Sequence, residues 1–140
     1  MQVTAAQQDS TICLTLPADY EELPLIRHVI RQTLPPLSRD QESRYLGAIT
    51  EIAANAIESV TATPLWPYIS LTIQLHPQPA VIIADRGPGI DASSHKPTKY
   101  GNLGQGLIIA KAAVPNLSIS STAAGTIVRL PYPLPNQAAS

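Results

Sequence analysis

A run of apolar residues that ends in an acid and two glycines is the feature that most limits the folds open to this chain. The run spans 81–84, and Asp85-Arg86-Gly87-Pro88-Gly89-Ile90 follows it. A short apolar run stopped by turn-forming residues predicts a buried strand. Asp85 then lies at the end of that strand, and the glycines can adopt backbone angles that a side chain would forbid. Such a loop can hold a ligand, although an ordinary Asp-x-Gly turn is the commoner use of this pattern.

Length and composition favour one domain with an ordinary core. A chain of 140 residues can bury such a core without disulfides or metal. Charged residues make up 14% and the formal net charge is -1, so bulk charge provides no basic surface for nucleic acid. Cys13 is the single cysteine and cannot form an intrachain disulfide, and the N-terminus lacks the pattern of a signal peptide. Since no apolar run approaches the roughly 20 residues that span a bilayer, we expect a cytoplasmic protein without membrane contacts.

The spacing of apolar residues predicts a single domain over 11–133, with loose ends at 1–10 and 134–140. Period-2 alternation or a short apolar run indicates strands at 11–16, 68–76, 81–84, 117–121 and 126–132. Recurrence every three or four residues indicates helices at 17–34, 40–60 and 107–114. The short link at 77–79 should join its two flanking strands as an antiparallel hairpin.

The helix expected at 40–60 carries two polar side chains of interest. Ser38 and Asp40 can cap its N-terminus. Glu51 and Asn55 are four residues apart, so their side chains project from the same side of the helix. A polar helix face taken alone is most often simply solvated.

Glycines gather in the second half of the chain. Five of the seven lie between Gly87 and Gly106, and the stretch Gly101-Asn102-Leu103-Gly104-Gln105-Gly106-Leu107 leads into the third helix. Free amides and the helix dipole favour a phosphate at such a position, although Gly-x-Gly before a helix is by itself a weak signal. The polar stretch 91–100 is expected to be a loop whose lysines stay in solvent.

Four motifs together resemble the nucleotide-binding boxes of the GHKL ATPases, the superfamily that includes the histidine kinases and gyrase. They are Glu51-x-x-x-Asn55-Ala56, Asp85-x-Gly87-x-Gly89-Ile90, Gly104-x-Gly106-Leu107 and Gly125-Thr126. Their order extends over nearly the whole chain, and the resemblance is greatest to the free-standing anti-sigma-factor and switch-protein serine kinases of bacteria. It implies a two-layer α/β sandwich in which a mixed, mostly antiparallel sheet of about five strands carries three helices on one face.

The resemblance implies a role for each motif. Asp85 would accept the adenine amino hydrogen with support from Thr126, and the loop beside the base would hold Gly87, Gly89 and Ile90. Asn55 would supply an oxygen to Mg2+, and Glu51 would be the base that orients the attacking hydroxyl. The phosphates of ATP would bind backbone amides of Gly104, Gly106 and Leu107.

The implied activity is ATP- and Mg2+-dependent phosphorylation of a Ser or Thr. The implied partners are a small regulatory protein of the anti-sigma-antagonist kind, a sigma factor, or both, and a homodimer is one assembly that the resemblance allows. Two alternatives stay open: a nucleotide-binding regulatory module without phosphoryl transfer, and a detached catalytic domain of a histidine kinase.

The chain departs from the family pattern at two positions. Asn102 stands where the first glycine of the phosphate box is usual, and Asn tolerates left-handed backbone angles better than most residues. Ser59 stands where a His or Tyr often follows the metal-binding Asn.

Overall fold

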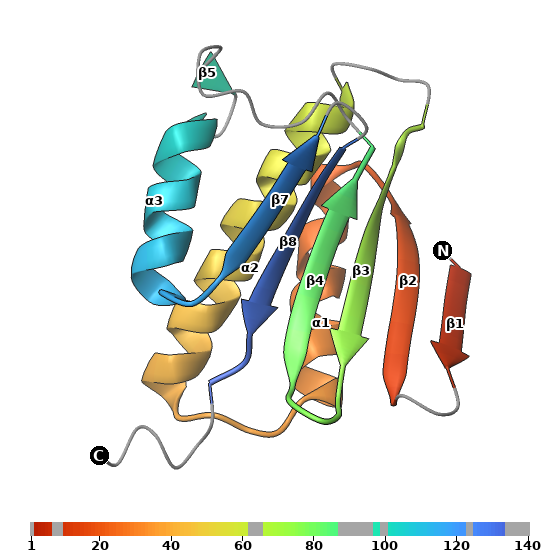
Figure 1. Cartoon of the computed structure of the whole chain (residues 1–140), viewed down its shortest axis with the longest axis vertical. Coiled ribbons are helices and arrows are strands. Elements are labelled where there is room, and N and C mark those ends of the chain that lie inside the picture. Colours follow the sequence, from red (N-terminus) through yellow and green to blue (C-terminus); the bar gives the residue numbers. More distant parts are fainter. Residues whose placement is uncertain are drawn as a thin grey trace.

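The computed structural model describes residues 2–6, 10–61, 66–86, 97–98, 101–122 and 125–133 and shows a sheet with helices on one side (Figure 1). The main sheet has six strands in the order β1-β2-β3-β4-β8-β7, and each neighbouring pair is antiparallel. These strands are β1 (Gln2–Ala6), β2 (Thr11–Pro17), β3 (Tyr68–Gln74), β4 (Ala80–Asp85), β7 (Ser118–Thr122) and β8 (Gly125–Pro131). The remaining elements are the short pair β5 (Pro97–Thr98) and β6 (Gly101–Asn102), the 3-10 helix η1 (Tyr20–Glu22), and the helices α1 (Leu23–Thr33), α2 (Arg39–Thr61) and α3 (Leu103–Ala113).

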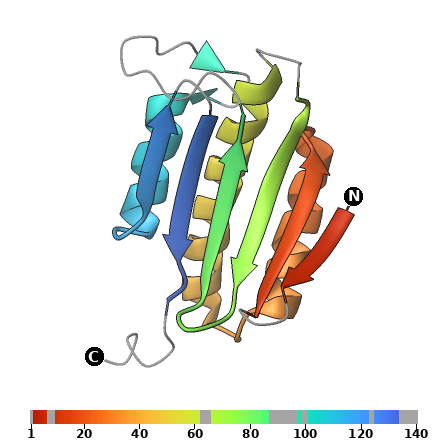
Figure 2. The ribbon, with the colours of Figure 1, turned by 45° about the vertical axis from the view of Figure 1, so that its right-hand side comes forward.

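The structure confirms the predicted two-layer sandwich with three α-helices on one face of the sheet, and the β3–β4 hairpin (Figure 2). It differs from the prediction in two respects. The sheet has six strands rather than about five, and no described pair of neighbours is parallel. Residues 2–6, predicted to be part of a loose end, form the edge strand β1. As an edge strand, β1 gains its place in the sheet through backbone pairing with β2.

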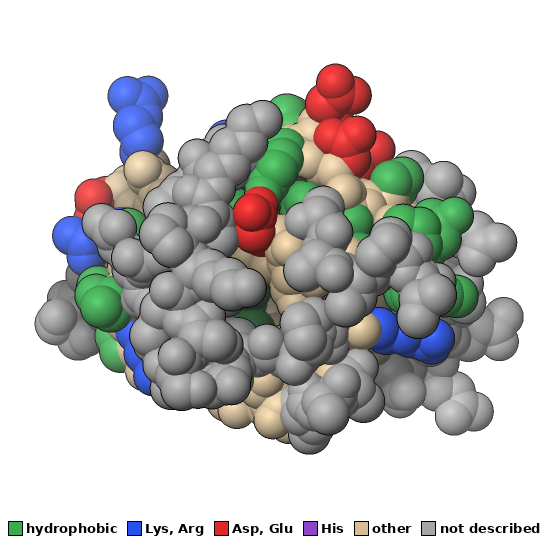
Figure 3. Space-filling model, turned by 90° about the horizontal axis from the view of Figure 1, so that it is seen from above, with side chains coloured by type: hydrophobic (Ala, Val, Ile, Leu, Met, Phe, Trp, Pro, Cys, Tyr) green, Lys and Arg blue, Asp and Glu red, His purple; other side chains and the backbone are tan. Residues whose placement is uncertain are grey.

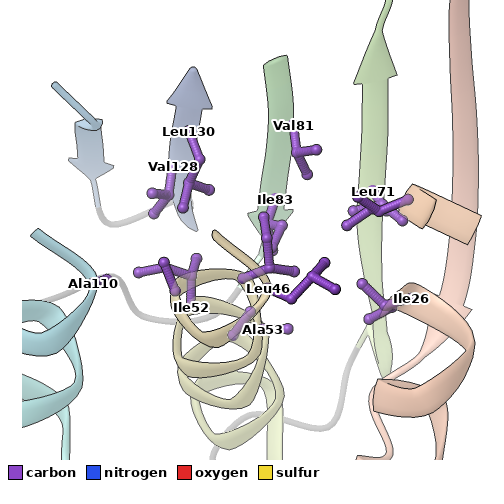
Figure 4. Close-up of a cluster of buried hydrophobic side chains, with 14 of the residues drawn as sticks. Ile26, Leu46, Ile52, Ala53, Leu71, Val81, Ile83, Ala110, Val128 and Leu130 are labelled. Atoms are coloured by element: carbon purple, nitrogen blue, oxygen red, sulfur yellow. The ribbon is translucent and has the colours of Figure 1, made fainter. Parts of the chain in front are cut away.

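The core lies between the sheet and the helices. Alternate side chains of the strands point to the helix layer and are buried, while their neighbours point to the open face. Figure 4 shows Ile52 and Ala53 of α2 beneath Ile83 of β4 and Val128 of β8. Ile26 of α1 contacts the same layer near β3, so all of these elements share one core.

Helix α2 begins with a capping box. The Gln41 backbone amide donates to the Ser38 hydroxyl over 3.1 Å, and the Ser38 backbone amide donates to the Gln41 side-chain oxygen over 3.3 Å. The prediction of Ser38 as an N-cap is thus confirmed, and Asp40 instead lies in the first turn. In the part of the chain described, no helix combines the length and apolar character needed to cross a membrane.

Two tyrosines join the lower end of the sheet to the helices. The Tyr45 hydroxyl is buried and donates to the Leu130 carbonyl over 2.6 Å. The Tyr132 ring packs edge-on against Tyr45 with 4.9 Å between ring centroids, and its hydroxyl donates to the Pro35 carbonyl. Burial raises the pKa of Tyr45 far above the ordinary value, and burial together with the Glu42 charge raises the pKa of Tyr132 to about 12.

These pKa shifts predict a loss of stability at high pH. The folded state favours the neutral phenols. Their contribution to the free energy of unfolding is therefore fully present below the unfolded pKa of about 10, and it is lost as pH rises from there through about 12. Urea unfolding between neutral and strongly alkaline pH should show this decline, and Tyr132→Phe should make it shallower. At neutral pH, Tyr45→Phe should cost about 1 kcal/mol through the lost hydrogen bond. An alkaline decline of the same slope in wild type and both variants would contradict this assignment.

Candidate active site

Four elements reach the same end of the sandwich. In Figure 1, β4 and α2 end at the top of the molecule, where β8 and α3 begin. Figure 3 views the molecule from this end, and acidic side chains are exposed there toward the helix side. The predicted site residues on these four elements therefore lie at one end of the molecule, although they come from distant parts of the chain.

Asp85 and Thr126 are direct neighbours across the sheet. They are register partners in the β4–β8 pairing. By strand alternation, the Asp85 side chain points to the helix layer, as the buried Val81 and Ile83 do. Thr126 is 4% exposed, and its hydroxyl lies 3.1 Å from that of Ser121 on β7. This places a carboxylate beside the buried Thr126 hydroxyl, which is an arrangement that can bind an amino group or hold a water.

Gly125 brings the start of β8 very close to the end of β4. Its φ is +145°, and a Cβ built there would lie 2.0 Å from the Asp85 carbonyl oxygen. Only glycine avoids this overlap, so the backbone of β8 can approach Asp85 only because residue 125 has no side chain. The glycine of the predicted Gly125-Thr126 motif thus sets the geometry around Asp85.

Glu51 and Asn55 meet the first turn of α3. A Cβ at Gly106 would lie 3.2 Å from the Glu51 Oε2 atom and 3.1 Å from the Asn55 Nδ2 atom. The prediction that the Glu51 and Asn55 side chains project from the same side of α2 is therefore confirmed, and that side faces α3. Gly106 leaves the small gap that both polar side chains border.

The polar groups on this part of α2 have unused hydrogen-bonding capacity. The Asn55 Nδ2 atom and the Ser59 hydroxyl are buried and find no partner among the residues described. An unpaired buried donor costs free energy unless a ligand or water accepts from it. A phosphate oxygen or a water in a magnesium shell could do so. The chain's described part holds no cluster of three or more His, Cys, Asp or Glu side chains, but Mg2+ commonly binds through one or two protein oxygens and keeps its waters.

Replacing Gly106 by Ala should weaken nucleotide binding without unfolding the protein. The added methyl group would push Glu51 and Asn55 aside by a few tenths of an ångström. We expect an ATP dissociation constant raised about tenfold by calorimetry, equivalent to about 1.4 kcal/mol.

The matched control is Gly47→Ala, also in a helix. Nothing lies within 4 Å of a Cβ at Gly47, so this change should raise stability by about 0.5–1 kcal/mol and leave ATP affinity alone. Equal ATP affinity for Gly106→Ala and wild type would show that this gap is not part of the nucleotide site.

The remaining site predictions concern the glycine-rich segments. Gly87, Gly89 and Ile90 lie outside the described residues. Helix α3 begins at Leu103, four residues earlier than the predicted start at Leu107. Gly104 therefore lies in the first turn, where backbone amides have no partner within the helix, while the Gly106 and Leu107 amides are positioned to bond the Asn102 and Leu103 carbonyls. The binding of phosphates by the Gly104, Gly106 and Leu107 amides stays a prediction.

Sequence reasoning missed Ser121. Its hydroxyl contacts Thr126 because the two residues are register partners in the β7–β8 hairpin. Ser121 belongs to a run of serines without a motif, and only the register of that hairpin could have identified it.

The family comparison agrees with this geometry. The family model of the histidine kinase-like ATPase domain matches residues 16–132, which include all four motifs and the elements that carry them. The chain belongs to the histidine kinase-like ATPase family. The resemblance stated from the motifs is thereby confirmed. No curated protein matches this chain.

Two solved structures show the same fold of this ATPase family. One contains the RsbU and RsbW domains of Rv1364c from Mycobacterium tuberculosis, with 23% identity and a TM-score of 0.63 over 87% of this chain and 31% of that one. The other is the histidine kinase domain of the blue-light activated histidine kinase EL346 from Erythrobacter litoralis, with 20% identity and a TM-score of 0.58 over 97% of this chain and 72% of that one. The present chain thus spans about a third of the Rv1364c structure.

Proposed function

We propose that this domain is an ATP- and Mg2+-dependent protein serine/threonine kinase of a bacterial partner-switching system. The observation that carries the proposal is the meeting of Glu51 and Asn55 with the first turn of α3 at Gly106. A carboxylate and a carboxamide beside free helix amides are the groups that phosphoryl transfer requires: a base, a metal ligand and phosphate donors. The similarity to a structure that contains an RsbW domain supports the partner-switching context.

Each group on this chain has a separate task in that reaction. Bound with Mg2+, ATP supplies the phosphoryl group. Asp85, backed by Thr126 across the β4–β8 pairing, accepts a hydrogen from the adenine amino group. The Asn55 carboxamide offers its oxygen to the metal and its unpaired Nδ2 to a phosphate oxygen or a metal-bound water. The first amides of α3 hold the phosphates.

Glu51 orients the acceptor. It lies one helical turn before Asn55 on the same side of α2, so its carboxylate borders the gap at Gly106 where the transferred group would lie. From there it accepts the proton of the incoming Ser or Thr hydroxyl. The acceptor belongs to a small regulatory protein of the anti-sigma-antagonist kind, and the same domain could hold a sigma factor by sequestration.

Calorimetry of ATP binding tests the nucleotide site. Wild-type protein should bind ATP more tightly with Mg2+ than without it. Asp85→Asn presents an amide in place of an acceptor carboxylate, and we expect it to weaken ATP binding about 100-fold, or 2.7 kcal/mol, because a charged hydrogen bond is lost and a donor faces a donor. Wild-type protein that binds no ATP at millimolar concentration would rule out the kinase and leave a partner-binding module.

The acceptor chemistry separates this proposal from a second candidate. Because a histidine kinase domain is among the similar structures, a His acceptor on a partner is the alternative. Phosphoserine and phosphothreonine survive acid, whereas phosphohistidine does not. A phosphorylated product that loses its label in acid would favour the histidine kinase.

A further inference from the structure

The open face of the sheet carries a hollow that meets the candidate nucleotide site only at one end, at Asp85 and Gly125. Its volume is about 400 Å3, and it lies near the end of the strands where Asp85 stands. Its floor comes from alternate residues of five adjacent strands, namely Thr15, Ser70, Ala84, Ile127 and Ser120. Because neighbouring strands are about 4.8 Å apart, a floor of this width extends about 19 Å across the sheet. That shape suits an elongated segment better than a compact small molecule.

Exposed aromatic and aliphatic side chains line the hollow. Trp66 is 43% exposed, Tyr68 is 40% exposed and Ile127 is 51% exposed. The Trp66 and Tyr68 rings contact edge to face with 5.5 Å between centroids. The Arg86 guanidinium carbon lies 4.3 Å from the Trp66 ring centroid, which fixes the cation above the aromatic surface. Trp, Tyr and Arg are the residues most enriched at energetically dominant positions of protein interfaces.

The charge of this face identifies what could cover it. Charged side chains on the open face can come from β2, β3, β4, β7 and β8 and from the residues beside their ends. Within the described ranges, strand alternation directs Arg86 and Arg129 to this face. Asp85 lines the end of the hollow, but its carboxylate points to the helix layer, as Val81 and Ile83 do. A second copy of this chain packed face to face would place arginines against arginines, which is unfavourable. A partner with carboxylates beside apolar side chains would complement the surface.

We propose that this hollow binds an acidic amphipathic segment of a partner protein. The apolar side chains of that segment would pack on Trp66, Tyr68 and Ile127, and a neighbouring carboxylate would pair with Arg86. The surface lies on the face opposite the nucleotide site, so both could be occupied together.

Trp66 provides the measurement because it is the only tryptophan of the chain. The probe is a synthetic helical peptide of about 18 residues with leucines on one side and glutamates on the other, compared with the same peptide carrying lysines. We expect the acidic peptide to change Trp66 emission in a saturable way and to bind at least about tenfold tighter than the basic peptide. Arg86→Glu should reverse this preference, and Tyr68→Ser should weaken both peptides, as measured by calorimetry.

Two controls separate this site from general effects and from the nucleotide site. Ile108→Ser removes an apolar side chain that is 70% exposed on α3 and should not change peptide binding. Asp85→Asn should also leave peptide binding unchanged, because its side chain faces the helix layer. If this variant loses ATP binding but still binds the peptide, the result would support peptide binding at the hollow independently of the kinase proposal.

Three results would overturn the inference. Equal affinity for acidic and basic peptides would show that charge does not select the partner. Concentration-dependent dimerisation abolished by Tyr68→Ser would assign the face to a second copy. Saturable binding of indole-3-acetate without binding of the acidic peptide would indicate a small-molecule pocket instead.

Discussion

Replacing Gly125 by Ala should destabilise the fold by about 3 kcal/mol or more and abolish ATP binding. An alanine Cβ would lie 2.0 Å from the Asp85 carbonyl oxygen and 3.0 Å from the Arg86 Cα atom, both backbone atoms that cannot rotate away. The φ of +145° is also one that side chains rarely adopt. Relief requires β4 and β8 to separate where Asp85 pairs with Thr126. Urea unfolding and ATP calorimetry measure the two effects.

Gly47→Ala is again the matched control, because it makes the same chemical change where nothing is close. A Gly125→Ala protein with wild-type stability and ATP affinity would contradict the close approach of β8 to Asp85. If Gly125→Ala fails to fold, the milder Thr126→Ser should still bind ATP and Thr126→Val should not, because the first keeps the hydroxyl that contacts Ser121 and the second removes it.

Glu51→Gln should lower the rate of phosphoryl transfer by about 100-fold to 10,000-fold while ATP affinity stays within about threefold. Glutamine keeps the size of the side chain beside Gly106 but cannot accept a proton from the attacking hydroxyl. Intrinsic ATP hydrolysis, with water as the acceptor, provides an assay that needs no partner, and calorimetry gives the affinity.

The control is Glu58→Gln, on the same helix two turns later. Glu58 lies on the same side of α2 as Glu51 but about 10 Å further along the helix axis, and it accepts a hydrogen bond from the Tyr20 hydroxyl. We expect the Glu58→Gln variant to retain wild-type turnover of ATP. Loss of turnover in both variants would point to a general electrostatic effect, and loss in neither would favour the nucleotide-binding module without phosphoryl transfer.

Apolar periodicity predicted most of the fold because the helices and central strands each bury one face. The errors fall where burial does not determine the structure. The sequence predicts the start of α3 at Leu107, yet the helix begins at Leu103 and Gly106 meets Glu51 and Asn55. Glycine has low helix propensity, so Gly101, Gly104 and Gly106 give no sequence signal for this earlier start. Strand β1 lies in the N-terminal stretch that the sequence predicts to be loose, and backbone pairing with β2 places it in the sheet.

The candidate site was only partly predictable for a related reason. Glu51 and Asn55 are four residues apart on one helix, so sequence spacing alone places them together. The contact of Gly125 with Asp85 and that of Ser121 with Thr126 depend on strand register. The hollow beside Trp66 needs five strands in their final order, and no stretch of sequence contains that information.

The strand order also affects how quickly the chain can fold. The β3–β4 and β7–β8 hairpins are local, but β2 pairs with β3 only after α1 and α2 have been placed between them, and β4 meets β8 only after α3. Closing such long loops costs entropy before any pairing energy is gained, so folding should be slower than for a helical bundle of the same length. Asp85 and Thr126 acquire their shared geometry only at the β4–β8 closure. The end of the molecule that carries the candidate nucleotide site should therefore be among the last parts to form during refolding.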